Sequence, residues 1–415
     1  MPMRLPAFQL ALAPVGWLFF AALLALFAIN AIRLSVGDLL SVSNPELAIM
    51  FDPGQSAVRV TLSQRAYLED ISRLDEATAG ARDALDHNPL APEALTLLGR
   101  FAQEKDDDRQ AADLMRLASR VNLRSLEPQI WLLDRDIRRG DVAPALQRID
   151  ILFRGQSSGT LGPLVLALAP ALTSEPYRLG FTGLLRANPK WRAYVLDELS
   201  ARSSDLPGLN ALFAALQAGD NPPTAPELAA FLTRLITGGM LDQAYLAWTK
   251  SLPPERLRRQ EYLYNARFQY AMTNLPFDWV FAPVSGALIG VSTENGRRIL
   301  NVDFFGGRVP FQNVSHLLTL APGPYRFSGL ERSENLQNER GIWWRLFCVG
   351  KPADSLAATD LQTDEKPWRE FTVDFDVPRD NCPYQELVLE LPARVVRETE
   401  IIGGVSYANL EIKPR

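Results

Sequence analysis

The chain begins with a long segment that lacks charged side chains. No charged residue lies between 10 and 32, and the core of this segment, 15 to 29, is almost purely apolar. About 20 residues at roughly 1.5 Å per residue cross a hydrocarbon layer ~30 Å thick. We predict a transmembrane helix over residues 10–32 after a short cytoplasmic tail, residues 1–9. A cleaved signal peptide is the alternative, although its apolar region usually spans only about 7 to 15 residues.

A helical pattern with an internal period follows this segment. Ala77, Ala111 and Ala145 recur at 34-residue steps, and Asn-Pro or Asp-Pro pairs separate apolar helical runs. Small side chains let two helices approach closely, and proline interrupts a helix because it lacks an amide hydrogen. A period of this length predicts helical hairpins stacked into a solenoid. We predict such repeats over residues 40–270, with a blurred register beyond Gly162.

Near residue 275 the apolar period changes from 3.6 to 2. Alternating apolar positions occur in five runs, at residues 277–281, 300–304, 342–348, 371–377 and 387–391. Glycine, proline and asparagine clusters separate the runs, as expected for turns between short strands. We predict eight or nine strands that form an antiparallel β-sandwich over residues 275–415. The fold class is therefore multidomain: a transmembrane helix, an α-solenoid and a β-sandwich.

Composition and charge exclude several classes of function. The net charge of −5 over 415 residues offers no basic surface for a phosphate backbone. Only two histidines, His87 and His316, are present, which removes most zinc sites and catalytic triads. We therefore predict no metal, no cofactor and no nucleic-acid partner.

The positions of the cysteines indicate the kind of compartment in which the protein resides. Both of them, Cys348 and Cys382, lie in the predicted β region. Two cysteines confined to one small domain indicate a disulfide and an oxidising environment; two buried free thiols are the alternative. We predict an inner-membrane protein with a single span and with its bulk in the periplasm.

Two parts of the chain resemble known families. The pair Leu98-Gly99 resembles the Leu-Gly pair of the tetratricopeptide repeat. The later positions of that repeat are matched in the preceding unit by Ala77, Ala81, Ala84 and Pro89. The last segment, residues 401–412, is similar to the closing strand of jelly-roll carbohydrate-binding modules, with matching residues at Tyr407, Leu410 and Ile412. Ala408 stands where such modules often carry an aspartate, so the calcium site that they often hold is not expected. The whole arrangement resembles bacterial envelope proteins associated with polysaccharide synthesis and export.

One strand supplies a candidate ligand platform. Alternation from Ile342 to Cys348 puts Trp343 and Arg345 on the face opposite Trp344. Aromatic faces stack on a pyranose while charged groups bind its hydroxyls. Trp343 and Arg345 are therefore our candidate glycan-binding residues. In the alternative, Trp343 packs under a loop and Arg345 pairs with a surface carboxylate.

Signatures of catalysis are weak. Asp278, Asp303, Glu331 and Glu334 are the available carboxylates for a glycosidase pair, but the sequence contains no nucleophile elbow and no phosphate-binding loop. We predict a membrane-tethered, non-catalytic scaffold whose repeats bind an envelope protein and whose sandwich binds glycan or another envelope component. A glycan-processing hydrolase or lyase with a repeat-built adaptor is the alternative.

Overall fold

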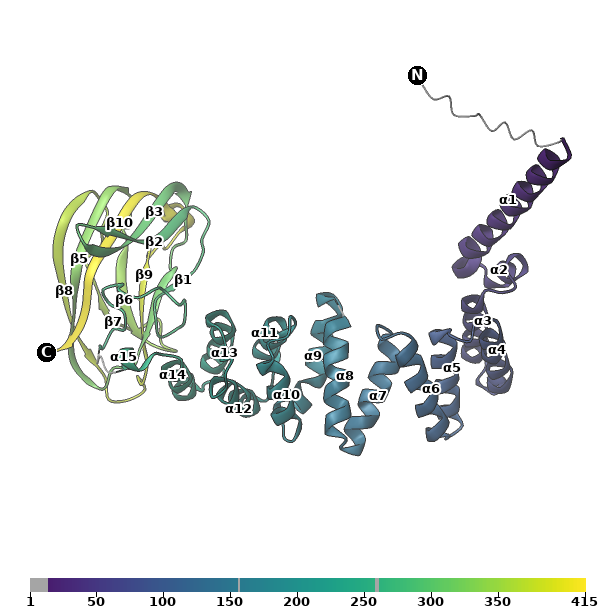
Figure 1. Ribbon diagram of the computed structural model, residues 1–415. Coiled ribbons are helices and arrows are strands. Elements are labelled where there is room, and N and C mark those ends of the chain that lie inside the picture. The colour runs from purple at the N-terminus through teal and green to yellow at the C-terminus, as the bar shows by residue number, and fades with distance from the viewer. Residues whose placement is uncertain (1–13, 156, 258–260) are drawn as a thin grey trace, which may run out of the picture. The chain divides into compact units, whose positions relative to one another are not determined.

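The computed structural model describes residues 14–155, 157–257 and 261–415 (Figure 1). The predicted tail, residues 1–9, and the first residues of the predicted transmembrane helix, 10–13, lie outside the described residues. Contacts divide the chain into two compact units, Met1–Ser157 and Ser158–Arg415. The second unit contains helices as well as the β-sandwich. Each unit is described by itself.

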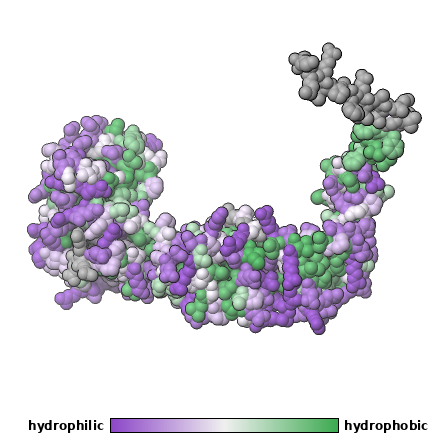
Figure 2. Space-filling view, viewed as in Figure 1, coloured by the Kyte–Doolittle hydropathy of each residue, from purple (hydrophilic) through white to green (hydrophobic). Residues whose placement is uncertain are grey.

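The first long helix of the chain, α1 (Pro14–Ser43), is apolar on its exposed surface (Figure 2). Its segment Phe19–Ser43 is long and apolar enough to cross a membrane, and residues 19–35 are all exposed, whereas Gly37 near the end of the helix is buried. Large side chains such as Leu26 and Phe27 are almost fully exposed. A helix that is apolar all round and makes no core contacts is typical of a membrane span.

The rest of the first unit consists of helical hairpins, as the period predicts. The helices are α2 (Pro45–Phe51), α3 (Ser56–Glu69), α4 (Leu74–His87), α5 (Pro92–Glu104), α6 (Asp108–Val121), α7 (Leu126–Arg139) and α8 (Val142–Gly155), with a 3-10 turn, η1 (Ile71–Arg73), before α4.

Local chemistry explains where these helices begin and how they pack. Pro92 occupies the first position of α5, and the Asp107 carboxylate caps α6 by accepting from the Gln110 amide at 2.9 Å. The repeated alanines are buried between helices. At Gly99 a Cβ would lie 3.0 Å from Met115 Cε, so glycine permits the close approach of α5 to α6.

The second unit starts with further helices. They are α9 (Ser158–Thr173), α10 (Tyr177–Arg186), α11 (Arg192–Arg202), α12 (Leu206–Gln217), α13 (Ala225–Thr237), α14 (Leu241–Lys250) and α15 (Pro254–Leu257). The Asn-Pro pair at Pro189 lies in the break between α10 and α11. Stacked aromatic rings join successive hairpins: the ring centroids of Phe213 and Phe231 lie 3.9 Å apart.

Ten strands in the described part of the chain form two antiparallel sheets, which confirms the predicted sandwich. Sheet A has the order β1-β4-β9-β6-β7 and sheet B the order β2-β3-β10-β5-β8. The strands are β1 (Val280–Phe281), β2 (Ala287–Glu294), β3 (Arg297–Arg308), β4 (Val314–Leu318), β5 (Gly323–Gln337), β6 (Trp343–Cys348), β7 (Ser355–Ala358), β8 (Lys366–Val377), β9 (Gln385–Glu390) and β10 (Glu400–Pro414), and a 3-10 turn, η2 (Val396–Thr399), precedes β10.

The sandwich core lies between the two sheets. Trp279 is fully buried there, as expected, and its ring centroid lies 5.6 Å from that of Trp344. Tyr407, from the closing strand, packs edge-on against Trp344 at 5.2 Å. Cys348 and Cys382 form a disulfide with a Cα–Cα distance of 5.1 Å, so the predicted bridge is present.

One strand prediction is wrong. The alternation of Phe277, Trp279 and Phe281 does not form a strand through residue 277, because β1 covers only Val280–Phe281. The amide of Asp278 donates to the carbonyl of Leu275 at 2.9 Å, which closes a turn here. Phe277 instead packs against Tyr245 of α14, with ring centroids 5.2 Å apart.

Candidate ligand-binding site

The structure places Trp343 and Arg345 together on the outward face of sheet A. Both side chains reach the carboxylate of Glu390 on β9: Trp343 Nε1 donates to Oε1 at 3.1 Å. Arg345 Nε donates to the same oxygen at 2.6 Å and its Nη2 to Oε2 at 3.0 Å. The pair therefore shares one acidic partner across neighbouring strands.

This part of sheet A is largely covered. Arg345 Nη1 donates to the carbonyl of Pro352, in the loop after β6, and its guanidinium lies 4.6 Å from the ring centroid of Phe347. Phe347 and its neighbour Val388 are buried. Burial raises the pKa of Glu386 on the same face, against the opposing effect of Arg345. The donors of the predicted platform are thus already engaged by the protein.

The outward face of sheet B carries a second polar and aromatic array. The register aligns Asn301 of β3 with Ser406 of β10, and Ser406 with Arg332 of β5. Beyond Arg332 lies Trp368 of β8, whose ring centroid is 4.7 Å from the guanidinium carbon. A row of amide, hydroxyl, guanidinium and indole groups therefore crosses four strands; we call these four residues the sheet B row.

Hydrogen bonds order this row. Ser406 Oγ donates to Asn301 Oδ1 at 2.9 Å, and Asn301 Nδ2 donates to Ser292 Oγ at 2.7 Å. Arg332 Nη2 lies 3.2 Å from Glu294 Oε2, and Arg332 Nε lies 3.1 Å from Glu334 Oε1. The side chains are held in place, while the acids that pair with Arg332 remain accessible to solvent.

Glycines keep the sheet beside this row free of side chains. Nothing lies within 4 Å of the position that a Cβ on Gly290 would take. Gly404 pairs with Asp303 on one side and Glu334 on the other, and a Cβ there would lie 2.9 Å from an Asp303 carboxylate oxygen. A ligand can therefore approach the backbone closely at Gly290, whereas the Asp303 carboxylate occupies the space over Gly404.

The four carboxylates considered for catalysis separate into two groups. Asp278 and Glu331 are buried inside the sandwich. Glu331 Oε1 lies 2.5 Å from Arg369 Nη2, and burial raises the pKa of Glu331 despite this cation. Asp303 and Glu334 are exposed on either side of Gly404, so their backbones lie two strand spacings, about 10 Å, apart.

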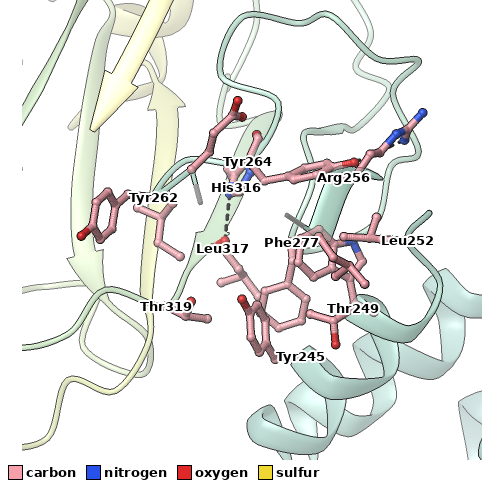
Figure 3. A pocket seen from close by; sticks show the side chains of 14 residues that line it. Tyr245, Thr249, Leu252, Arg256, Tyr262, Tyr264, Phe277, His316, Leu317 and Thr319 are labelled. Carbon is pink, nitrogen blue, oxygen red and sulfur yellow. Dashed lines mark hydrogen bonds between the residues drawn. The ribbon is translucent and has the colours of Figure 1, made fainter. Parts of the chain in front are cut away.

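A small aromatic cleft lies where the last helices meet the sandwich (Figure 3). Its volume is about 90 Å³, and its walls include Tyr245, Trp248, Tyr264 and Phe277. These rings pack against one another: the centroids of Trp248 and Tyr264 lie 5.0 Å apart with perpendicular planes. Because the rings contact each other, the cleft is a packed joint between α14 and sheet A rather than an open platform for a sugar.

A hydrogen bond strengthens this joint. The hydroxyl of Tyr384, just before β9, donates to Asp242 Oδ1 of α14 at 2.6 Å. Burial, and then the neighbouring Asp242 carboxylate, raise the pKa of Tyr384.

The repeats of the first unit enclose a larger hollow. It has a volume of about 310 Å³ and is lined by residues of α3 and α5 and by the start of α7. The lining mixes apolar and polar groups, such as Val60, Gln64, Leu97 and Arg100. Arg100 Nη1 lies 3.5 Å from Glu127 Oε1 at one end. This hollow offers both apolar contact and hydrogen-bonding groups to a chain segment of another protein.

No protein-family model matches this chain, and no curated protein matches it in sequence. Solved structures with some likeness include a CBM4 carbohydrate-binding module, with a TM-score of 0.29 and 14% identity, covering 37% of this chain and 99% of that chain. A CBM61 module in complex with β-1,4-galactotriose has a TM-score of 0.26 and 12% identity, covering 38% of this chain and 100% of that chain. YrrB, a tetratricopeptide protein with an unusual peptide-binding site, has a TM-score of 0.25 and 14% identity over 50% of this chain and 90% of that chain. Likenesses this distant do not define the ligand of this chain.

The sheet B row was not predicted from the sequence. Its members come from four strands that lie far apart along the chain, so no local spacing reveals them. A register irregularity between Glu331 and Ser333 also shifts the alternation at Arg332 relative to β8. The available signal was Trp368 itself, a large aromatic residue between Pro367 and Arg369 in a strand whose apolar alternation begins only at Phe371.

Proposed function

We propose that this protein is a membrane-tethered, non-catalytic adaptor of the bacterial cell envelope that binds glycan through the outward face of sheet B. The observation that carries the proposal is the sheet B row, which aligns indole, guanidinium, hydroxyl and amide groups beside two glycines. In the proposed complex Trp368 packs on the apolar face of a sugar ring. Arg332 and Asn301 bind its hydroxyls, and the buried Ser406 holds Asn301 in place.

The ion pairs on the two faces favour sheet B over the predicted platform on sheet A. The side chains of Arg345 and Glu390 are only 19% and 13% exposed. Arg332 is 21% exposed, close to Arg345, but its partners Glu294 and Glu334 are 43% and 61% exposed. Exposed ion pairs contribute little to stability, so sugar hydroxyls can replace them at low cost. Glycan binding at Trp343 and Arg345 would instead require a more buried pair to open.

The tether and the compartment form the second part of the proposal. The length of α1 supports an uncleaved span of the inner membrane, and the disulfide supports an oxidising compartment such as the periplasm. The hollow of the repeats suits an extended segment of an envelope partner protein. A role in exopolysaccharide synthesis or export unites a membrane tether, a protein-binding solenoid and a glycan-binding sandwich.

Binding measurements on the full chain in lipid nanodiscs test the glycan site. After a panel of bacterial polysaccharides has identified a ligand, Trp368→Ala is expected to lower its affinity at least about tenfold, or ~1.4 kcal/mol. Trp343→Ala serves as the matched control and is expected to bind as the unaltered chain does. Thermal unfolding of both variants confirms that they are folded. Unchanged binding by Trp368→Ala would contradict the proposal, and loss of binding in Trp343→Ala alone would transfer the site to sheet A.

One observation favours glycan hydrolysis as a second candidate. Asp303 and Glu334 flank Gly404 on the same face, and inverting glycosidases place their carboxyl groups about 6.5–9.5 Å apart. Against hydrolysis, both side chains are exposed and Glu334 pairs with Arg332, whereas a general acid needs surroundings that keep it protonated. Release of reducing ends that disappears in both Asp303→Asn and Glu334→Gln would establish the enzyme; no release supports the adaptor.

A further inference from the structure

Helix α1 is longer than a membrane requires. Residues 14 to 32 carry no charge, and these 19 residues span about 28 Å, close to the ~30 Å hydrocarbon thickness. Arg33 then marks the level at which the helix leaves the hydrocarbon. The helix continues without interruption to Ser43. If α1 is the anchor of the proposed function, its last ten residues project from the membrane surface.

Helix α2 folds back along this projecting part of α1 (Figure 1). The Asn44 side chain caps α2 by accepting from the Leu47 amide at 3.2 Å, which reverses the chain. At the other end of α2, the position of a Cβ on Gly37 lies 3.1 Å from Asp52 Cβ. The C-terminal end of α2 therefore lies level with Gly37. That level is four residues, or about 6 Å, beyond Arg33.

The end of α2 presents apolar side chains to solvent. Met50 is 74% exposed, Leu47 is 43% exposed and Phe51 is 40% exposed. The polar layer of a bilayer leaflet is about 5–7 Å thick on each side of the hydrocarbon. The returning end of α2 is thus both apolar and at the depth of this layer.

We propose that Met50 and Phe51 insert into the interfacial layer of the bilayer that α1 crosses. The occupant of this surface is lipid, because α1 places the end of α2 within reach of the membrane without any further protein. Insertion gives the first hairpin a second attachment point and so fixes its orientation at the membrane. The inference rests on the anchoring role of α1 in the proposed function.

A single labelled thiol in the full chain tests this contact. Both native cysteines are joined in the disulfide, so an introduced cysteine is the only free thiol. Met50→Cys carries an environment-sensitive fluorophore, and the protein is placed in lipid nanodiscs with or without lipids that bear a nitroxide quencher near the headgroup. Leu24→Cys, within the apolar part of α1, reports the anchor itself with lipids that bear the nitroxide deep in the acyl chain, because this position lies about 14 Å from Arg33. Leu123→Cys, a position 59% exposed between α6 and α7, is the matched control.

The expected result for Met50→Cys is blue-shifted emission that the nitroxide lipid quenches at least about twofold more than at Leu123→Cys. Phe51→Cys is expected to behave as Met50→Cys does. Water-like emission at both positions, with Leu24→Cys quenched, would overturn the insertion while leaving the anchor intact. Blue-shifted emission that lipid does not quench would show that a second copy or another protein covers α2, and would also overturn it. If Leu24→Cys itself is not quenched, the anchor in the proposed function fails.

Discussion

Individual buried polar residues show which protonation state the sandwich selects. His316 is buried on β4, with Nδ1 2.8 Å from the carbonyl of Leu317 and Nε2 3.1 Å from that of Tyr264. Burial lowers the pKa of His316, and this effect outweighs the Asp278 carboxylate and the two carbonyls, which raise it. Burial therefore disfavours the charged imidazolium form of His316 in the folded protein.

This burial predicts a pH dependence of stability. Because the folded pKa of His316 is depressed, its contribution is present above the ordinary pKa of about 6.5 and is lost as the pH falls through the folded pKa. We expect the free energy of unfolding to fall as the pH is lowered from 7.5 to 5. His316→Asn is expected to remove the part of this pH dependence that comes from His316. Urea unfolding across this range measures it. His87→Asn, at an exposed position, is the control, and parallel profiles for the unaltered protein and His316→Asn would contradict the prediction.

At the scale of elements, the disulfide joins parts of sheet A that are neighbours in space. Cys348 ends β6 and pairs in register with Gln385, the first residue of β9. Gln385 is fully buried and donates to the carbonyl of Cys382 at 2.8 Å. The bridge therefore secures the chain between β6 and β9, a segment that includes β7 and β8.

Loss of the bridge is expected to destabilise the sandwich. Its cysteines are separated by 34 positions, and closing a loop of that length contributes ~3 to 4 kcal/mol in the chain-entropy model. Reductant, or the double change Cys348→Ser and Cys382→Ser, should lower the free energy of unfolding by about this amount. Tryptophan fluorescence in urea follows the transition. The double variant should not respond to reductant, and an unaltered protein that is equally insensitive would refute the prediction.

At the scale of the whole molecule, the chain has two units of different architecture, and the apolar helix α1 belongs to the first. The first unit is built from helical hairpins, and the second joins further helices to the sandwich through the contacts of α14. The surfaces that we propose to face lipid and sugar thus belong to separate elements of one chain. This separation suits a tethered adaptor, because each surface can act without altering the other.

The proposed topology has a direct test. A phosphatase reporter that is active only in an oxidising compartment, fused after Arg415 and expressed in a Gram-negative host, is expected to be active. The physical reason is that the disulfide between Cys348 and Cys382 favours an oxidising compartment, whereas a single anchor is compatible with a body on either side of the membrane. The same fusion without residues 1–32 should lose activity. An active reporter of the cytoplasmic type at the same position would contradict the localisation.

Much of the architecture follows from local patterns in the sequence. The repeated alanines predict the hairpins because only small residues permit such close helix approach, and Ala77, Ala111 and Ala145 are indeed buried. Alternation places Trp344 inside the sandwich and Trp343 outside because strand side chains point to opposite faces. The period change near residue 275 and the pairing of the two cysteines follow in the same way, from information carried by neighbouring positions.

The candidate site depended on tertiary structure. Asn301, Arg332, Trp368 and Ser406 come together only through the order and register of four strands, which no local pattern specifies. The engagement of Trp343 and Arg345 by Glu390 likewise required the pairing of β6 with β9. The sequence by itself determined which elements form, because propensity and burial act over a few residues. Only the tertiary structure decided which side chains share a face, because strand pairing joins residues that are up to about a hundred positions apart, as Asn301 and Ser406 are.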